Sequence, residues 1–198
     1  IPAVQTTYQS FLGADGKKVV GLANYQWIFG TEANWVFLRN TAIWIVITPI
    51  FSTAVGLILA LLMDRMRRES LPKSLIFMPM AISFVGASII WGLVYEYRDP
   101  SETQVGLLSA VVSAFGITPE NWLLLQPWNT FFLIIIMVWI QVGFAMVVLS
   151  AAIKAIPMDV TEAAMLDGAV GWKLFSKVTV PMIRGTLVVV LTTIAIGV

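Results

Sequence analysis

The sequence of 198 residues contains no cysteine and no histidine. Disulfide bonds, thiolate nucleophiles and imidazole bases or metal ligands are therefore excluded within it. A glycine-rich phosphate-binding loop that ends in lysine is also missing, so the chain is not expected to hydrolyse ATP itself. We predict no catalytic residue, no metal site and no bound cofactor, and we expect a protein that is not an enzyme.

Charged residues are scarce as well, at 12% of the sequence, whereas 59% of the residues are hydrophobic. Globular domains carry about 25% charged residues, so this chain has roughly half the usual supply of solvated surface. The net charge of +1 offers no electrostatic attraction to nucleic acid. This composition indicates a membrane protein, with lipid as the surrounding solvent.

The first long uncharged stretch, 40–63, has about 24 residues, and as a helix of roughly 36 Å it would cross a bilayer. Pro49 lies inside this stretch and is expected to kink the helix. Further apolar stretches cover 74–95, 130–153 and 185–198, the last being the start of a span. We therefore predict an all-α membrane protein, a polytopic transmembrane helix bundle with about four spans. The chain would be one domain over 1–198 and a fragment of a longer protein.

Small side chains line one face of the first predicted span. Ser52, Gly56 and Ala60 recur every four residues, which places them on one side of a helix. Small residues at this spacing let two transmembrane helices approach each other closely. We therefore expect this face to contact another helix of the bundle as an ordinary packing surface.

Basic residues are unevenly divided among the predicted loops. Four lie in 64–73 and four in 154–184, whereas 96–129 holds only one. Because loops rich in lysine and arginine stay in the cytoplasm, we place 64–73 and 154–184 on that side. The segments 1–39 and 96–129 then face outward. Leucine, valine and phenylalanine at helical spacing over 107–115 predict a short amphipathic helix in the second of these segments.

The cytoplasmic loop 154–184 mixes charge with helical periodicity. Pro157 suits the first turn of a helix, and Asp159 and Glu162 stand at the spacing of a capping box. Gly168 would allow a left-handed residue where that helix ends. The loop is therefore predicted to begin with a helix closed by a glycine turn.

A second short helix is predicted beyond the glycine turn. Trp172 and Phe175 would give it an apolar face, and Lys173 and Lys177 a basic one. Pro181 should stop or bend this helix before the last span. Helix, turn and helix between two spans would form a rigid lever, but inert connectors show the same pattern, and both interpretations stay open on these grounds.

The residue pattern of this loop resembles a motif of a known family. Glu162-Ala-Ala-Met-Leu-Asp-Gly168 is followed, after nine residues, by Val178-Thr-Val-Pro181. This pattern resembles the EAA loop of permease subunits of bacterial ABC importers, with valine in place of the usual isoleucine and leucine. Ile156-Pro157, Gly21-Leu-Ala-Asn-Tyr25 and Arg39-Asn-Thr41 look most like the branch that imports sugars, to which maltose permeases belong.

The resemblance implies the fold of type I ABC importers and a permease subunit of the bacterial inner membrane. In such importers the EAA helix, called the coupling helix, docks into a cytoplasmic ATPase dimer that binds ATP and magnesium. A second permease subunit and a periplasmic or lipid-anchored solute-binding protein complete the complex. By their positions in the motif, the residues that would contact the ATPase are Glu162, Ala163, Ala164, Asp167 and Gly168. Pro181 marks the end of the motif.

A sugar is bound by aromatic faces and by hydrogen-bonding side chains in a cavity. Span residues of suitable type are Phe84, Trp91, Trp139, Gln141 and Phe144. Gln141 is the favoured candidate because an amide inside a span seeks a hydrogen-bond partner. Packing against other helices or contact with lipid also explains each of these residues.

Three other functions stay open at this point. A permease of the same superfamily could carry another solute, such as glycerol phosphate. A secondary carrier or channel that works alone would be a different class, and a structural membrane subunit that anchors a partner would be a third. No predicted span contains an ionisable residue, which proton- or sodium-coupled carriers often need. The sequence therefore favours energy supplied by an external ATPase.

Overall fold

The computed structural model describes residues 2–99 and 101–198, and nearly all of the regular structure in them is helical. The only β pairing in these two ranges is an isolated antiparallel bridge between Leu12 and Val19. The chain divides into two compact units, Ile1–Ile43 and Trp44–Val198. The predicted all-α class is confirmed.

The first unit contains two short helices, α1 (Pro2–Gln9) and α2 (Ala23–Gly30), on either side of a turn. The side-chain amide of Asn24 donates hydrogen bonds to the carbonyl oxygens of Ser10 (2.8 Å) and Leu12 (2.9 Å). This amide therefore joins the start of α2 to the end of α1, which closes the turn between them.

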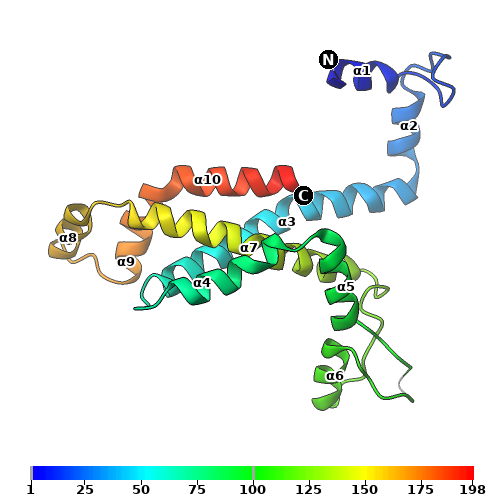
Figure 1. The fold of residues 1–198 in the computed structure, drawn as a ribbon. Helices are drawn as coiled ribbons and strands as arrows, with labels where there is room; N and C mark the ends of the chain where they lie inside the picture. Colours follow the sequence, from blue (N-terminus) through cyan, green and yellow to red (C-terminus); the bar gives the residue numbers. More distant parts are fainter. Residues whose placement is uncertain (1, 100) are drawn as a thin grey trace. The chain divides into compact units, whose positions relative to one another are not determined.

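Helix α3 (Glu32–Met63) is 32 residues long and contains the first predicted span (Figure 1). It begins eight residues before position 40, where the uncharged stretch starts, so that Glu32 and Arg39 belong to the same helix. The helix also continues through Pro49. An uncharged stretch marks the part of a helix that suits lipid, not the part of the chain that is helical, and this explains the earlier start.

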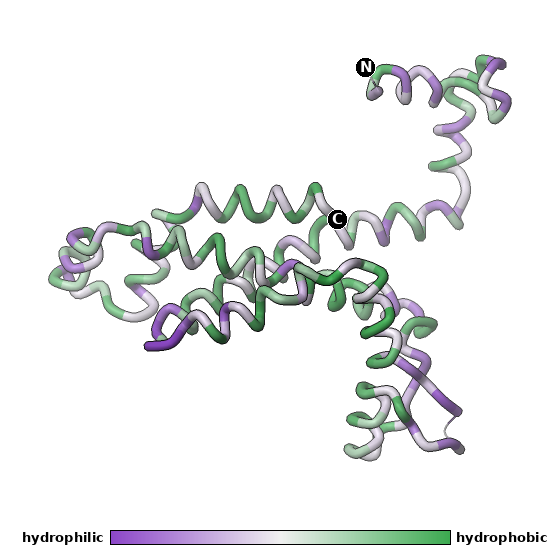
Figure 2. The backbone as a smooth tube through the Cα atoms, viewed as in Figure 1, coloured by the Kyte–Doolittle hydropathy of each residue, from purple (hydrophilic) through white to green (hydrophobic). Residues whose placement is uncertain are grey.

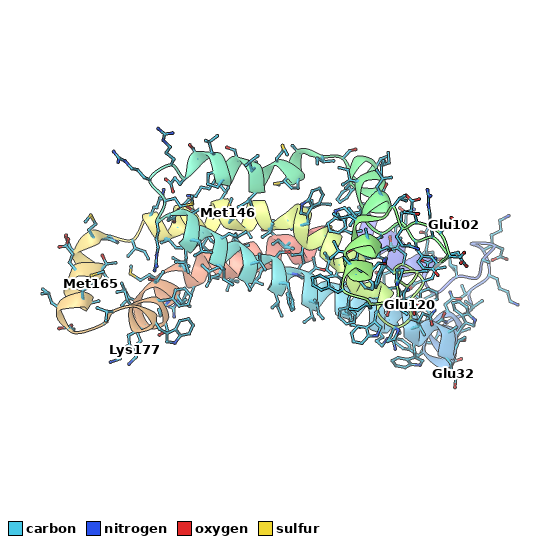
Figure 3. The ribbon with its side chains drawn as sticks, turned by 90° about the horizontal axis from the view of Figure 1, so that it is seen from below. Glu32, Glu102, Glu120, Met146, Met165 and Lys177 are labelled. Carbon is cyan, nitrogen blue, oxygen red and sulfur yellow. The ribbon has the colours of Figure 1, made fainter. Side chains whose placement is uncertain are left out.

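Helix α7 (Asn129–Lys154) is central to the second unit. Both α10 (Val180–Gly197) and α4 (Ser70–Phe77) lie against it (Figure 1). Hydrophobic residues dominate α7 and α10 (Figure 2), and Met146 of α7 lies among the helices (Figure 3). The buried apolar residues of this core come from α3, α7 and α10: Ala60, Ala145, Met146, Leu149, Ile183, Val190 and Ile194.

Two glycines allow the helices of this bundle to approach α7 closely. A Cβ atom placed on Gly56 of α3 would lie only 2.6 Å from the Cβ of Ala145. A Cβ atom on Gly143 would lie 2.6 Å from the carbonyl oxygen of Ile76 in α4. The other two members of the small-residue face of α3 are buried too. The prediction that this face packs against another helix is confirmed.

The segment 74–95, which the sequence predicts as one span, is not a single helix. It is divided among α4, a 3₁₀ turn (η1, Met78–Ala81) and α5 (Phe84–Val94), and the two arms are inclined at 105°. Pro79 has no N–H to donate to a continuing helix. Ser83 starts α5 anew, because its side-chain oxygen accepts a hydrogen bond from the backbone N–H of Gly86 (3.1 Å).

The segment 96–129, predicted to face outward, contains α6 (Leu107–Ala114), which confirms the predicted short helix. Ser109 of this helix is buried, and its hydroxyl donates to the carbonyl oxygen of Glu96 (3.0 Å). The same hydroxyl accepts a hydrogen bond from the indole N–H of Trp122 (2.9 Å). The ring of Trp122 in turn lies 5.5 Å from that of Phe132, between centroids, so the segment is fastened to the first turns of α7.

The last helix begins earlier than predicted. A short helix α9 (Trp172–Leu174), a π-helical turn (η2, Phe175–Thr179) and α10 form one continuous run, Trp172–Gly197. The helix therefore does not stop at Pro181, one of the two effects predicted for this residue, and the start of the span at residue 185 stays a prediction. Pro181 lies in the first turn of α10, directly after the π turn, where a missing N–H costs little.

In the described residues, three helices are long and apolar enough to cross a membrane, or four if the bent pair forms one span. The three are Glu32–Met63, Asn129–Lys154 and Trp172–Gly197. This agrees with the predicted number of about four spans. The assignment of the two sides of the membrane stays a prediction.

Replacing Gly56 with alanine should destabilise the bundle by about 1–3 kcal/mol, because the added methyl group would have to push α3 away from α7. The free energy of unfolding of the full-length protein in detergent measures this loss. Gly92→Ala, in α5, is the matched control, since nothing lies within 4 Å of the Cβ atom added there. Equal stability of the two variants would contradict the close contact.

Candidate functional site

Helix α8 (Met158–Leu166) follows the C-terminal end of α7 and is largely exposed to solvent. None of its residues is buried, and Leu166 and Met158 are 90% and 71% exposed. Met165 of this helix and Lys177 lie at the same end of the second unit (Figure 3). A helix of nine residues gains little stability from its own hydrogen bonds, so its apolar surface is available to a partner.

The start of α8 differs from the prediction. Pro157 is the N-cap, with extended backbone (φ −58°, ψ 137°), and no side chain caps the helix. The predicted capping box between Asp159 and Glu162 is therefore wrong: with Pro157 at the cap, Asp159 is already the second residue of the helix. Asp159 still lies in the first turn, where a carboxylate interacts favourably with the helix dipole.

The end of α8 confirms the predicted glycine turn. Gly168 has a φ of +78°, in the left-handed region. Its N–H donates to the carbonyl oxygen of Met165 (3.0 Å), and the N–H of Ala169 donates to that of Ala164 (2.9 Å). These two bonds form a Schellman motif, which satisfies the last carbonyl groups of the helix. The chain can then reverse towards the next helix over only a few residues.

The five residues predicted to contact an ATPase all lie in α8 and its turn. Glu162, Ala163, Asp167 and Gly168 are exposed, and Ala164 is half-buried. The structure thus brings them together on one accessible element. Their role as contacts stays a prediction.

Beyond the turn, Trp172 and Phe175 contribute to an apolar groove against α3. Their rings are 5.1 Å apart, between centroids. The groove has a volume of about 520 Å³ and is lined by Ala54, Leu57, Ile58, Leu61, Arg65, Gly171, Trp172 and Phe175. The apolar face predicted for the second helix therefore faces α3.

Four charged side chains and one hydroxyl join the ends of α3, α4 and α7, and we call them the ionic cluster: Asp64, Glu69, Lys73, Ser150 and Lys154. The Nζ atom of Lys73 lies 2.5 Å from Oδ1 of Asp64 and 2.8 Å from Oε2 of Glu69. Lys73 also donates to the hydroxyl of Ser150 (2.6 Å), which donates to Asp64 (2.7 Å). Lys154 donates to Oε1 of Glu69. Two positive and two negative charges balance within the cluster.

Hydrogen bonds from Lys154 and then from Lys73 lower the pKa of Glu69 to about 2. A carboxyl whose pKa is lowered by folding stabilises the fold above its unfolded pKa and loses this effect as the pH falls towards its folded pKa. Glu69 therefore stays charged at neutral pH, and its contribution to stability is lost only as the pH falls from the unfolded pKa of 4.5 towards about 2.

Sequence reasoning missed the ionic cluster. The basic residues of 64–73 were interpreted only as a sign of sidedness, although α4 begins at Ser70, inside that predicted loop. Lys73 meets Ser150 across 77 positions of the sequence. The available signal was local: acids at positions 64 and 69 accompany the bases of this short segment.

Two of the five candidate solute residues lie against each other, and the role of all five stays a prediction. Trp91 and Trp139 come together, with ring centroids 5.7 Å apart in an edge-on arrangement. The indole nitrogen of Trp91 is buried and has no hydrogen-bond partner among the described residues. Phe84 is 69% exposed, Phe144 packs against the apolar core, and Gln141 is half-buried beside the end of α10.

Comparison with known proteins relates most of the chain to transport proteins. Residues 37–198 match the family described as "Binding-protein-dependent transport system inner membrane component". The chain is 48% identical over 196 residues to the osmoprotective compounds uptake permease protein of Synechocystis sp., covering 99% of this chain and 70% of that protein. It is 49% identical over 195 residues to the alpha-glucoside transport system permease protein of Rhizobium meliloti, covering 98% and 58%. The chain thus spans only part of the length of each relative.

Two solved structures share the fold. One is described as a bacterial alginate ABC transporter in complex with alginate pentasaccharide-bound periplasmic protein, and it matches with a TM-score of 0.76 at 22% identity. It covers 98% of this chain and 64% of that chain. The other, a bacterial ABC transporter involved in the import of alginate, matches with a TM-score of 0.79 at 21% identity over 98% and 65%. The predicted bundle of the ABC importer kind is confirmed.

Replacing Gly168 with valine should loosen the turn that ends α8, because a β-branched residue at this φ is strained by about 1–2 kcal/mol. Nothing lies within 4 Å of a Cβ atom there, so the effect would come from the backbone alone. Hydrogen exchange of the full-length protein should show faster exchange for the amides of Gly168 and Ala169. Gly168→Asn should keep the turn, since asparagine tolerates the left-handed region. Unchanged protection in the valine variant would contradict the motif.

Proposed function

The chain belongs to the family of binding-protein-dependent transport system inner membrane components, and from this premise we propose that it is the permease subunit of an ATP-driven importer for a sugar or oligosaccharide. The family consists of transport subunits of the inner membrane and not of enzymes. The observation that carries the proposal is the exposed helix α8, which contains the EAA motif and lies between two helices long enough to span a membrane.

The proposed mechanism uses α8 as a lever. Helix α7 ends at Lys154, just before α8, and the helical run from Trp172 starts just after the glycine turn. A displacement of α8 therefore reaches two spanning helices through very short connections. Closure of an ATPase dimer on binding ATP and magnesium would pull on α8 and switch the access of a transmembrane cavity between the two sides.

The proposed partners are a cytoplasmic ATPase dimer, a second permease subunit and a periplasmic or lipid-anchored solute-binding protein. A role for a binding protein is supported by the family description. It is also supported by the alginate transporter, whose description includes a bound periplasmic protein. On the ATPase side, we propose contacts by Glu162, Ala163, Ala164, Asp167 and Gly168, all in α8 and its turn.

The proposed cargo follows from the relatives and from the aromatic pair. The relatives at 48% and 49% identity are named for osmoprotective compounds and for alpha-glucosides. Trp91 and Trp139 offer ring faces, and the indole N–H of Trp91 can donate to a hydroxyl oxygen. We therefore place sugar contacts at Trp91, Trp139 and Gln141, and we assign Phe144 to the packed core.

Uptake by the complete complex in proteoliposomes tests this function. Labelled alpha-glucosides, maltose, trehalose and glycerol phosphate would be offered through the cognate binding protein, with and without ATP inside. We expect ATP-dependent uptake of a glucoside or another sugar. Uptake of glycerol phosphate and of no sugar would favour a permease of the same superfamily for another solute. Uptake that persists without the ATPase subunits would favour a secondary carrier.

Reversing the charge of Glu162 should weaken binding of the ATPase subunits about tenfold, or 1.4 kcal/mol. The expected cause is the loss of a carboxylate from the exposed surface of α8, where it can pair with a base. Co-purification of the ATPase with full-length Glu162→Lys permease measures the effect. Glu120→Lys is the matched control, an exposed glutamate in the predicted outer segment. Equal loss in both variants would contradict the docking role.

A further inference from the structure

The ionic cluster lies at the root of α8. Lys154 is the last residue of α7, and α8 begins at Met158. The ammonium group of Lys154 donates to Glu69, the N-cap residue of α4. It also lies 3.8 Å from Oδ1 of Asp64, which directly follows α3. The cluster therefore connects the base of the coupling helix to two further helices of the bundle.

The centre of the cluster is shielded from solvent. The side chains of Asp64 and Lys73 are 13% and 17% exposed, and Ser150 is 4% exposed, whereas Glu69 and Lys154 at the edge of the cluster are 33% and 47% exposed. Partly dehydrated charges interact more strongly than charges in water, and separating them would leave each one without its partner. Movement of one helix end alone would break several of these bonds together.

The apolar core also joins α3 to α7 near this end, through Ala60 and Leu149. The ionic cluster adds the start of α4 to this junction, through Glu69 and Lys73. The close approaches at Gly56 and Gly143 join α3 and α4 to α7 further along the helix, before the C-terminal turn that holds Ser150 and Lys154. Without the cluster, the start of α4 would lose its polar link to the end of α7 and keep contacts further along, such as that of Ile76 at Gly143.

We infer that the ionic cluster clamps the ends of α3, α4 and α7 into one rigid body that moves with α8, and that Lys154 and Glu69 are positioning residues of this clamp. The inference rests on the proposed function, because it requires an ATPase that displaces α8. It adds that the force reaches α3 and α4 through side-chain charges, besides reaching α7 and the run from Trp172 through the backbone.

The first test measures coupling. Full-length Lys154→Gln permease would be assembled with its partners, and the solute taken up per ATP hydrolysed would be compared with the wild type. We expect this ratio to fall several-fold while the amount of assembled complex stays the same. Lys154→Arg, which keeps the charge and a donor for Glu69, should retain the ratio.

Arg67→Gln is the matched control for this variant. Arg67 is an exposed base of the same short segment and forms no hydrogen bond or ion pair with the residues that the structure describes. It should leave the ratio unchanged. A wild-type ratio in Lys154→Gln would overturn the inference, and so would an equal fall in Arg67→Gln.

A second test replaces the clamp by a covalent link. Because the described chain contains no cysteine, Glu69→Cys with Lys154→Cys introduces its only two thiols. The unlinked double variant should lose coupling as Lys154→Gln does, and a reducible bifunctional methanethiosulfonate should restore it by rejoining the two helices. Uptake blocked by the link and recovered on reduction would show that the cluster has to open, which would overturn the inference.

The outcomes separate this inference from the proposed function. If the wild-type complex shows no ATP-driven uptake, the proposed function fails and the inference fails with it. If the wild type transports solute and Lys154→Gln transports as much per ATP, only the inference fails. If Lys154→Gln lowers the amount of complex, the covalent link decides: restored coupling supports the clamp, and coupling that stays low with the link in place overturns it.

Discussion

The close approach of α3 to α7 at Gly56 is the contact on which the second unit depends. Inside a bilayer, apolar surfaces gain nothing by leaving lipid for one another, so helices associate where their backbones can come near and pack well. Gly56 provides this on α3, and Gly143 provides it for α4. Both contacts involve α7, which therefore carries the core residues and sets the positions of its neighbours.

The elements proposed to act in coupling lie where this packing ends. Beyond the apolar core, the helices are joined by charge in the ionic cluster, and beyond the cluster α8 has no buried residue at all. Apolar packing, a polar cluster and an exposed helix thus follow one another along the bundle. This order suits the proposed mechanism, in which a partner displaces α8 and the bundle responds as a unit.

Local patterns were predicted correctly. The small-residue face of α3, the short helix in the outer segment and the left-handed Gly168 each depend on a few neighbouring residues, and all are present. The effect of proline on helix continuity was not predicted correctly from the sequence. The extended residues around Ser83 break the second span, whereas the π turn before Pro181 lets the last helix continue through a residue expected to stop it.

The sequence by itself determined the class of the protein, because hydrophobic runs of membrane length and the EAA motif each consist of residues close together in the chain. It also determined α8 and its glycine turn, apart from the form of the N-cap. Only the tertiary structure decided which distant side chains meet. Lys73 finds Ser150 across 77 positions, and Trp91 finds Trp139 on another helix. Such pairs depend on how helices cross and rotate against each other, and no local pattern in the chain records that geometry.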